Sequence, residues 1–84
     1  MPRDRFEAIS KKRILEHMQD AGYDDIEIDD IVTVWYCYML GNRKGLFAIP
    51  DLECYFETTH HKDRNAFYLD CYEKTENWTI CLEA

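Results

Sequence analysis

Five side chains in the second half of the chain could act together, namely Tyr55, Glu57, Tyr68, Asp70 and Tyr72. They fall at alternate positions of two apolar runs, and alternate residues of a β-strand share one face. Two carboxylates facing each other across strands, Glu57 and Asp70, could serve glycoside hydrolysis. Tyrosine favours another use, because its apolar ring with a polar tip is enriched in protein interfaces. We therefore interpret the five as a partner-binding face; alternatively, its tyrosines are simply good strand formers on a wetted surface.

A second cluster is acidic and lies between residues 23 and 30. It contains Asp24, Asp25, Asp29 and Asp30 around Ile26 and Ile28. The spacing lacks the glycine and the final glutamate of a calcium-binding loop. Two interpretations stay open: an exposed connection whose isoleucines dock inward, or an acidic patch that binds a basic partner. We include the four aspartates among the candidate partner-binding residues.

The other reactive side chains form no catalytic motif. His17 falls in a predicted helix, and the adjacent His60 and His61 fall in a predicted loop, where neighbours tend to point apart. The cysteines have no C-x-x-C spacing, so we expect buried thiols and neither disulfides nor a metal site. They are Cys37, Cys54, Cys71 and Cys81. We expect a protein that is not an enzyme and uses no cofactor.

The length and charge of the chain restrict its domain number, its partners and its location. The 84 residues suffice for a single domain, 1–84, with a net charge of −7. The first 13 residues carry five basic and two acidic residues, so the remainder is strongly acidic. This basic cluster is either a solvated helix face or a contact for nucleic acid or a partner. An apolar leader and a membrane-length apolar run are both missing, so we expect a cytoplasmic protein.

A helix is predicted over residues 4–21. Good helix formers dominate this segment, and Gly22 follows it at a position suited to a left-handed cap. Phe6, Ile14, Met18 and Ala21 fall on one side at helical spacing. We expect this stripe to pack on a sheet.

Residues 31–40 form the longest run without a charge, a glycine or a proline, and they are rich in β-branched and aromatic side chains. Both of its alternating sets are apolar, which predicts a central strand covered on both faces, with Trp35 buried. A turn at 41–45 and further strands at 46–49, 53–58, 66–73 and 78–82 follow. The connections are short, so we predict an α+β fold in which one N-terminal helix packs on a four- to five-stranded antiparallel meander. One apolar set would face the helix: Cys54, Phe56, Phe67, Leu69, Cys71, Trp78, Ile80 and Leu82.

The segment from 31 to 80 resembles a family of small uncharacterised phage and prophage proteins. The resemblance rests on Val34, Trp35, Cys37, Leu40, Asn42, Lys44, Leu46, Tyr55, Tyr68, Leu69, Asp70, Tyr72, Lys74, Glu76 and Asn77. The chain departs from the family in having Tyr36 and Cys71 where smaller residues are expected, and in its more polar 60–65 segment. The resemblance implies a phage gene expressed inside a bacterium, and it assigns no residue a role.

That provenance and the acidic surface together suggest a function. Carboxylates present negative charge much as phosphates do, so an acidic protein can compete for a groove that holds nucleic acid. We expect a binding protein that inhibits a host nucleic-acid enzyme or defence complex, of the anti-CRISPR kind, as a monomer or small homo-oligomer. The alternative is a DNA-associated accessory protein that uses the basic helix, although direct nucleic-acid binding is not our first expectation. A virion component is a third, without a feature in its favour.

Overall fold

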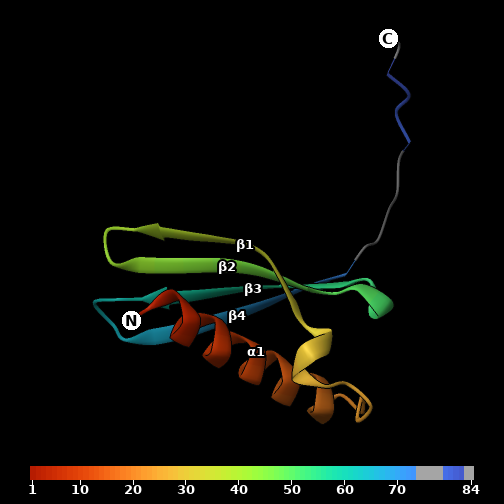
Figure 1. Ribbon diagram of the computed structural model, residues 1–84, viewed down its shortest axis with the longest axis horizontal. Coiled ribbons are helices and arrows are strands. Elements are labelled where there is room, and N and C mark those ends of the chain that lie inside the picture. The colour runs from red at the N-terminus through yellow and green to blue at the C-terminus, as the bar shows by residue number, and fades with distance from the viewer. Residues whose placement is uncertain (74–78, 83–84) are drawn as a thin grey trace.

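One helix packs against one face of a four-stranded antiparallel sheet (Figure 1). The computed structural model describes residues 1–73 and 79–82. Strand order in the sheet follows chain order, so the predicted α+β meander is confirmed in its four-stranded form. The elements are α1 (Arg3–Asp20), η1 (Ile28–Asp30), β1 (Val32–Met39), β2 (Asn42–Ile49), η2 (Pro50–Leu52), β3 (Cys54–His61) and β4 (Ala66–Glu73).

Helix α1 buries one narrow stripe against the sheet. Phe6, Ser10, Ile14 and Met18 recur every four residues and are all buried, as the 3.6-residue period requires for one face. The helix ends where expected, because Gly22 takes φ +98° in the left-handed region that glycine adopts at no steric cost. Ala21, which was predicted to be in the stripe, is exposed because it lies beyond the helix end.

The core lies between α1 and the two inner strands. Phe6, Phe47 and Phe56 are fully buried there, and Ile14, Met18, Ile31 and Ile49 complete the cluster. The ring of Phe6 stacks on Phe67 of β4 with centroids 5.7 Å apart and meets Tyr36 of β1 edge-on at 5.5 Å. Through Phe6 alone, helix α1 therefore contacts both outer strands of the sheet, β1 and β4.

Two hairpin loops are shorter than predicted. The β1–β2 turn contains Leu40 and Gly41, at φ +52° and +84°. Two successive positive φ values define the tight hairpin turn whose twist matches the strands. Residues 42–45 pair with β1 instead of looping, since polar side chains are tolerated on a strand. Likewise His60 and His61 end β3, and the loop to β4 is residues 62–65.

Strand β1 occupies an edge of the sheet, so its predicted central position is wrong. It pairs with β2 alone, and the meander order leaves its other side without a neighbouring strand in the described chain. Trp35 is 40% exposed and not buried. The apolar pattern on both sides of β1 shows only that its side chains are hydrophobic. Whether the strand is central or at an edge depends on the order of the strands in the sheet, which this pattern does not determine.

Two further expectations need correction. Residues 79–82 have no regular secondary structure, so they do not form the predicted fifth strand; Trp78 lies outside the described residues. Three of the four cysteines are exposed and Cys54 is half-buried, so they are not the buried thiols predicted. Cys37 and Cys71 belong to β1 and β4, the two edge strands of the sheet.

Candidate open sheet face

The sheet face opposite α1 carries the five residues of β3 and β4 that were predicted to bind a partner. The pairing register aligns them in rows across three strands: Ala48–Tyr55–Tyr72, Leu46–Glu57–Asp70 and Lys44–Thr59–Tyr68. No described element covers this face, which points away from the helix in Figure 1. We call the residues of these rows, together with those that β1 adds below, the open face.

Alternation along β3 explains why these side chains come together. Phe56 and Thr58 are buried toward α1, so their neighbours Tyr55 and Glu57 must project to the other side. Tyr55, Tyr68 and Tyr72 are each more than two-fifths exposed, which leaves their rings available for contact. The face assignment made from the sequence holds for β3 and β4.

One ion pair modifies the charge of the open face. The Lys44 Nζ atom lies 3.0 Å from Glu57 Oε1. Glu57 directly faces Asp70 across the β3–β4 ladder, an arrangement of like charges that destabilises a sheet unless a cation offsets it. The pKa of Lys44 is raised, first by its hydrogen bond to Glu57 and then by the Glu57 charge, with Tyr72 and Asp70 adding to the shift. Glu57 is thus already partnered, and Asp70 carries the less compensated charge.

Strand β1 extends the open face with three residues that the sequence interpretation did not include. Trp35 faces Leu46, Cys37 faces Lys44 and Met39 faces Asn42. A bulge between Thr33 and Trp35 shifts the alternation of the strand by one position. The hairpin could have revealed these residues from the sequence. A strand-pairing register assigned to residues 31–49 would have placed Trp35 beside Leu46.

Two hollows lie at the ends of this surface. One, of about 260 Å³, has Cys37, Met39, Leu40, Arg43 and Lys44 among its lining residues. The other, of about 460 Å³, lies between Val34 and Tyr55. Hollows flanking an aromatic surface can accept side chains of a bound protein.

The acidic connection lies on the helix side of the sheet, away from the open face. Figure 1 shows the segment from α1 to β1 in the same layer as the helix. Asp24, Asp25, Asp29 and Asp30 are exposed there, whereas the tyrosines point to the opposite side. The structure therefore does not join the two predicted clusters into one surface. Of the two isoleucines, Ile26 packs against the core and Ile28 is 40% exposed.

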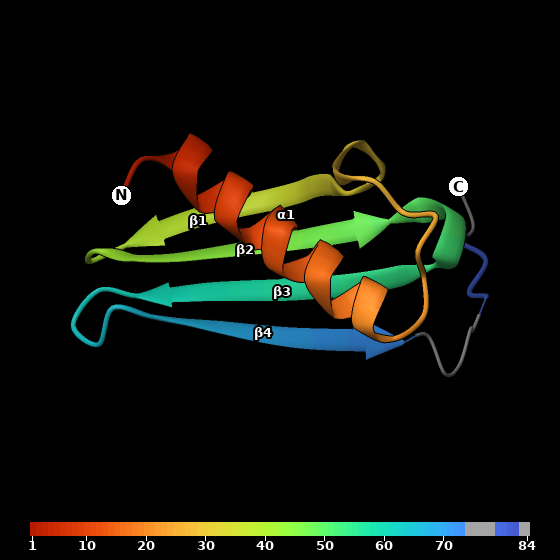
Figure 2. The same ribbon diagram turned by 90° about the horizontal axis from the view of Figure 1, so that it is seen from below.

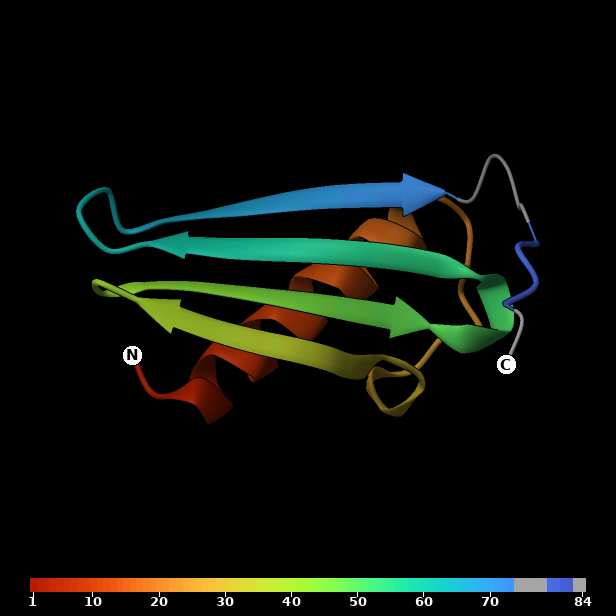
Figure 3. The same ribbon diagram turned by 90° about the horizontal axis from the view of Figure 1, so that it is seen from above.

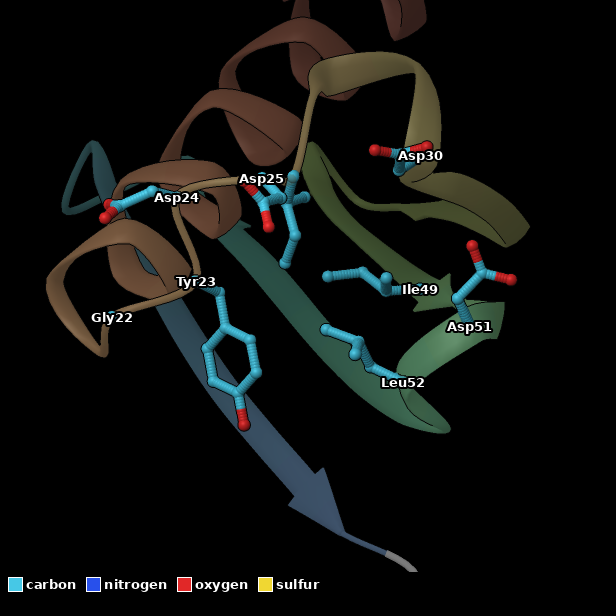
Figure 4. A pocket seen from close by; sticks show the side chains of 9 residues that line it. Gly22, Tyr23, Asp24, Asp25, Asp30, Ile49, Asp51 and Leu52 are labelled. Carbon is cyan, nitrogen blue, oxygen red and sulfur yellow. The ribbon is translucent and has the colours of Figure 1, made fainter.

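A pocket of about 300 Å³ opens beside this connection (Figure 4). Ile49 and Leu52 point into it and form an apolar floor, while Asp24 directs its carboxylate away from it. Asp30 has a structural task, because its Oδ2 accepts a hydrogen bond of 2.8 Å from the Glu27 backbone N–H at the start of η1. Within the described residues, no group of three or more histidine, cysteine or acidic side chains could hold a metal ion.

The basic start of α1 is partly neutralised within the helix. Arg3 Nε lies 2.9 Å from Glu7 Oε1, and Arg13 Nη1 lies 3.0 Å from Glu16 Oε2. The Arg3 guanidinium also lies 4.9 Å from the centre of the Tyr36 ring. Such exposed pairs contribute little stability, but they reduce the positive charge that the helix presents. These contacts pair two of the five basic residues in the first 13 positions.

The adjacent histidines point to opposite faces, as expected for neighbours on a strand. His60 is buried on the helix side, with Nε2 3.1 Å from Asn65 Oδ1 and its ring 5.0 Å from that of Phe67. His17 is exposed on α1, and its ring makes a T-shaped contact with that of Phe56, with the centroids 6.1 Å apart. Their contacts are those of packing residues.

The fold and the open face define a small α+β protein with one sheet surface that no described element covers. The chain belongs to a family of unknown function, DUF6275, whose model matches residues 7–82. The match begins within α1 and so covers more of the chain than the 31–80 segment that carried the resemblance. Neither the curated proteins nor the solved structures gave a match. None of the described helices has the length and apolar character needed to cross a membrane.

Proposed function

We propose that this protein acts by binding, without catalysis, and that it inhibits a host protein that handles nucleic acid. In this proposal it is a phage-encoded protein of the bacterial cytoplasm, and its target is a nucleic-acid enzyme or a defence complex of the kind that anti-CRISPR proteins block. The observation that carries the proposal is the open face. A four-stranded sheet leaves one face without a described covering element while that face displays Trp35 and three tyrosines.

The aromatic side chains would supply the contact energy. Tyrosine and tryptophan are enriched among the few interface residues that dominate binding, because their rigid rings bury a large area at low entropic cost. Tyr55 and Tyr72 face each other across the β3–β4 ladder, and Tyr68 lies on the same face. Asp70 separates Tyr72 from Tyr68 along β4, and Trp35 and Leu46 extend the row of Glu57 and Asp70 toward β1. The sheet backbone holds these side chains on one face before the partner arrives.

The charge of the chain would select the partner. A net charge of −7 repels phosphate and attracts proteins with a basic surface. Grooves that hold nucleic acid are basic, so an acidic protein can occupy them in place of the phosphate backbone. The four aspartates of the connection lie on the other side of the sheet from the tyrosines, and for this reason they would act at a distance, by steering the approach.

Affinity capture from phage-infected bacteria tests the proposal. The tagged chain should retain a host protein after the lysate is treated with nuclease, and a variant with Tyr68→Ala and Tyr72→Ala should retain less of it. The matched control is Tyr23→Ala, an exposed tyrosine outside the open face. The captured enzyme should then lose activity on adding the parent protein.

Other outcomes would contradict the proposal. Partners released by nuclease, together with a DNA shift at low salt that Lys12→Ala abolishes, would support the accessory protein that uses the basic helix. Undiminished capture by the double tyrosine variant would place the binding surface elsewhere.

A further inference from the structure

The outer edge of β1 has only one of the features that usually keep an edge strand from pairing, a bulge near its start. Natural edge strands also carry charged residues or proline, or are covered by another element. Val32–Met39 contains neither a charged residue nor a proline, and its one irregularity is the bulge near its start. Within the described chain β1 pairs only with β2, so the backbone groups on its other side find no strand. The opposite edge, β4, carries Asp70.

Helix α1 extends past this same edge. Figures 2 and 3 show the helix crossing the sheet diagonally, with its first turn outside β1 and its last turn toward β4. The sheet is thus narrower than the helix layer on the β1 side. A further strand beside β1 would lie over the first turn of α1, as β1 itself lies over Phe6.

We propose that this strand is β1 of a second copy of the chain, paired antiparallel about a twofold axis that passes through the sheet near the middle of β1. The two sheets would become one sheet of eight strands in the order β4-β3-β2-β1-β1-β2-β3-β4. Both helices would lie on one side of it and both open faces on the other. The apolar side chains of β1 would gain neighbours from their counterparts, chiefly Trp35, Tyr38 and Met39, now 40%, 57% and 67% exposed.

Charge explains why a second copy fits this edge. Two chains with a net charge of −7 repel each other over most of their surfaces. In a twofold antiparallel pair each side chain faces one from the same strand, so any charge near the axis would oppose its own kind. β1 has no charged residue, and self-pairing there brings no like charges face to face. The same pairing through β4 would bring the two copies of Asp70 into one ladder.

The mass in solution tests the pairing. At about 50 μM, size-exclusion chromatography with light scattering should give twice the chain mass of 10.1 kDa. Cys37→Lys places an ammonium group near the axis at an exposed position, and it should give the single-chain mass with an unchanged circular dichroism spectrum. Tyr72→Lys, which also places a lysine on the open face but on the opposite edge strand, should keep the double mass.

A cross-link provides a readout that does not depend on a folded variant. A short bis-maleimide should join two parent chains through Cys37, and Cys37→Ser should abolish most of this product. A parent protein with the single-chain mass at 50 μM would overturn the proposal. So would a Cys37→Lys protein that keeps the double mass, or a cross-link that persists in Cys37→Ser.

Discussion

Ser10 Oγ of the helix and Thr58 Oγ1 of the sheet lie 2.7 Å apart, and both side chains are buried. The two residues are 48 positions apart in the sequence, so this hydrogen bond exists only when α1 is docked. Each hydroxyl satisfies the other in a layer otherwise filled by phenylalanine and isoleucine, where an unpaired hydroxyl would be destabilising. The pair thus fixes where along β3 the helix sits.

Ser10→Ala should lower the free energy of unfolding by about 1–3 kcal/mol, because the Thr58 hydroxyl is left buried without a partner. Urea denaturation measures the change. The control is the double variant Ser10→Ala with Thr58→Val, which removes both hydroxyls and should recover part of the loss. Losses that simply add in the double variant would show that the two residues do not interact.

The edge position of β1 predicts a contrast between two aromatic residues. Phe47→Ala should cost about 3–5 kcal/mol, since the ring is fully buried against Phe6 and Phe56. Trp35→Ala should cost about 1–2 kcal/mol, because the indole is already partly in water. Chemical denaturation of both variants at a concentration where the chain is monomeric measures the difference. Equal losses of stability in the two variants would mean that Trp35 is as buried as Phe47 and that β1 is not an exposed edge strand.

Stability at high pH should depend on Lys44. Its pKa is raised in the folded protein, so the stability it contributes is complete below its usual value near 10.5 and declines as the pH rises through the folded value. Lys44→Arg keeps the cation beside Glu57 at these pH values, because arginine does not lose its proton there. The parent should therefore lose stability relative to Lys44→Arg above about pH 10.5. Superimposable curves for the two proteins would rule out a stabilising ion pair.

The two candidate clusters should affect binding differently, since they lie on opposite sides of the sheet. Tyr68→Ala or Tyr72→Ala should weaken binding mainly by speeding dissociation. The loss of binding free energy should be about 2 kcal/mol if the residue is central to the interface. Joint neutralisation of Asp24, Asp25 and Asp29 should mainly slow association and flatten its salt dependence. Surface plasmon resonance against the captured partner separates the two rates. If the tyrosine variants instead slowed association, the tyrosines would not have the proposed role of holding the bound partner.

Much of the fold could be predicted from local patterns. The 3.6-residue stripe of Phe6, Ile14 and Met18 and the alternation along β3 and β4 each depend on one element and one face. For the same reason the five residues of the open face on these strands were found together. The turn was placed too late because a Leu-Gly pair carries little turn signal compared with the polar segment that follows.

The errors concern relations between elements. The pattern of 31–40 gives no information on strand order, so it could not show that β1 lies at an edge. The acidic cluster was joined to the tyrosines because both are surface features, yet the connection leaves α1 on the helix side of the sheet. The sequence does not predict that Ser10 is buried, because a serine in an apolar stripe needs a hydrogen-bond partner, and that partner, Thr58, is known only once the helix is placed on the sheet.

The chain order of the sheet also has a kinetic consequence. Each strand pairs with its neighbour through a connection of two to four residues, so the hairpins can close in microseconds without help from distant segments. Helix docking joins residues nearly 50 positions apart and requires a formed sheet, so we expect it to follow the rate-limiting step. Substitutions at Ser10 should then accelerate unfolding and leave the folding rate nearly unchanged, a φ-value near zero. A φ-value near one would mean that the helix is already docked when the sheet forms.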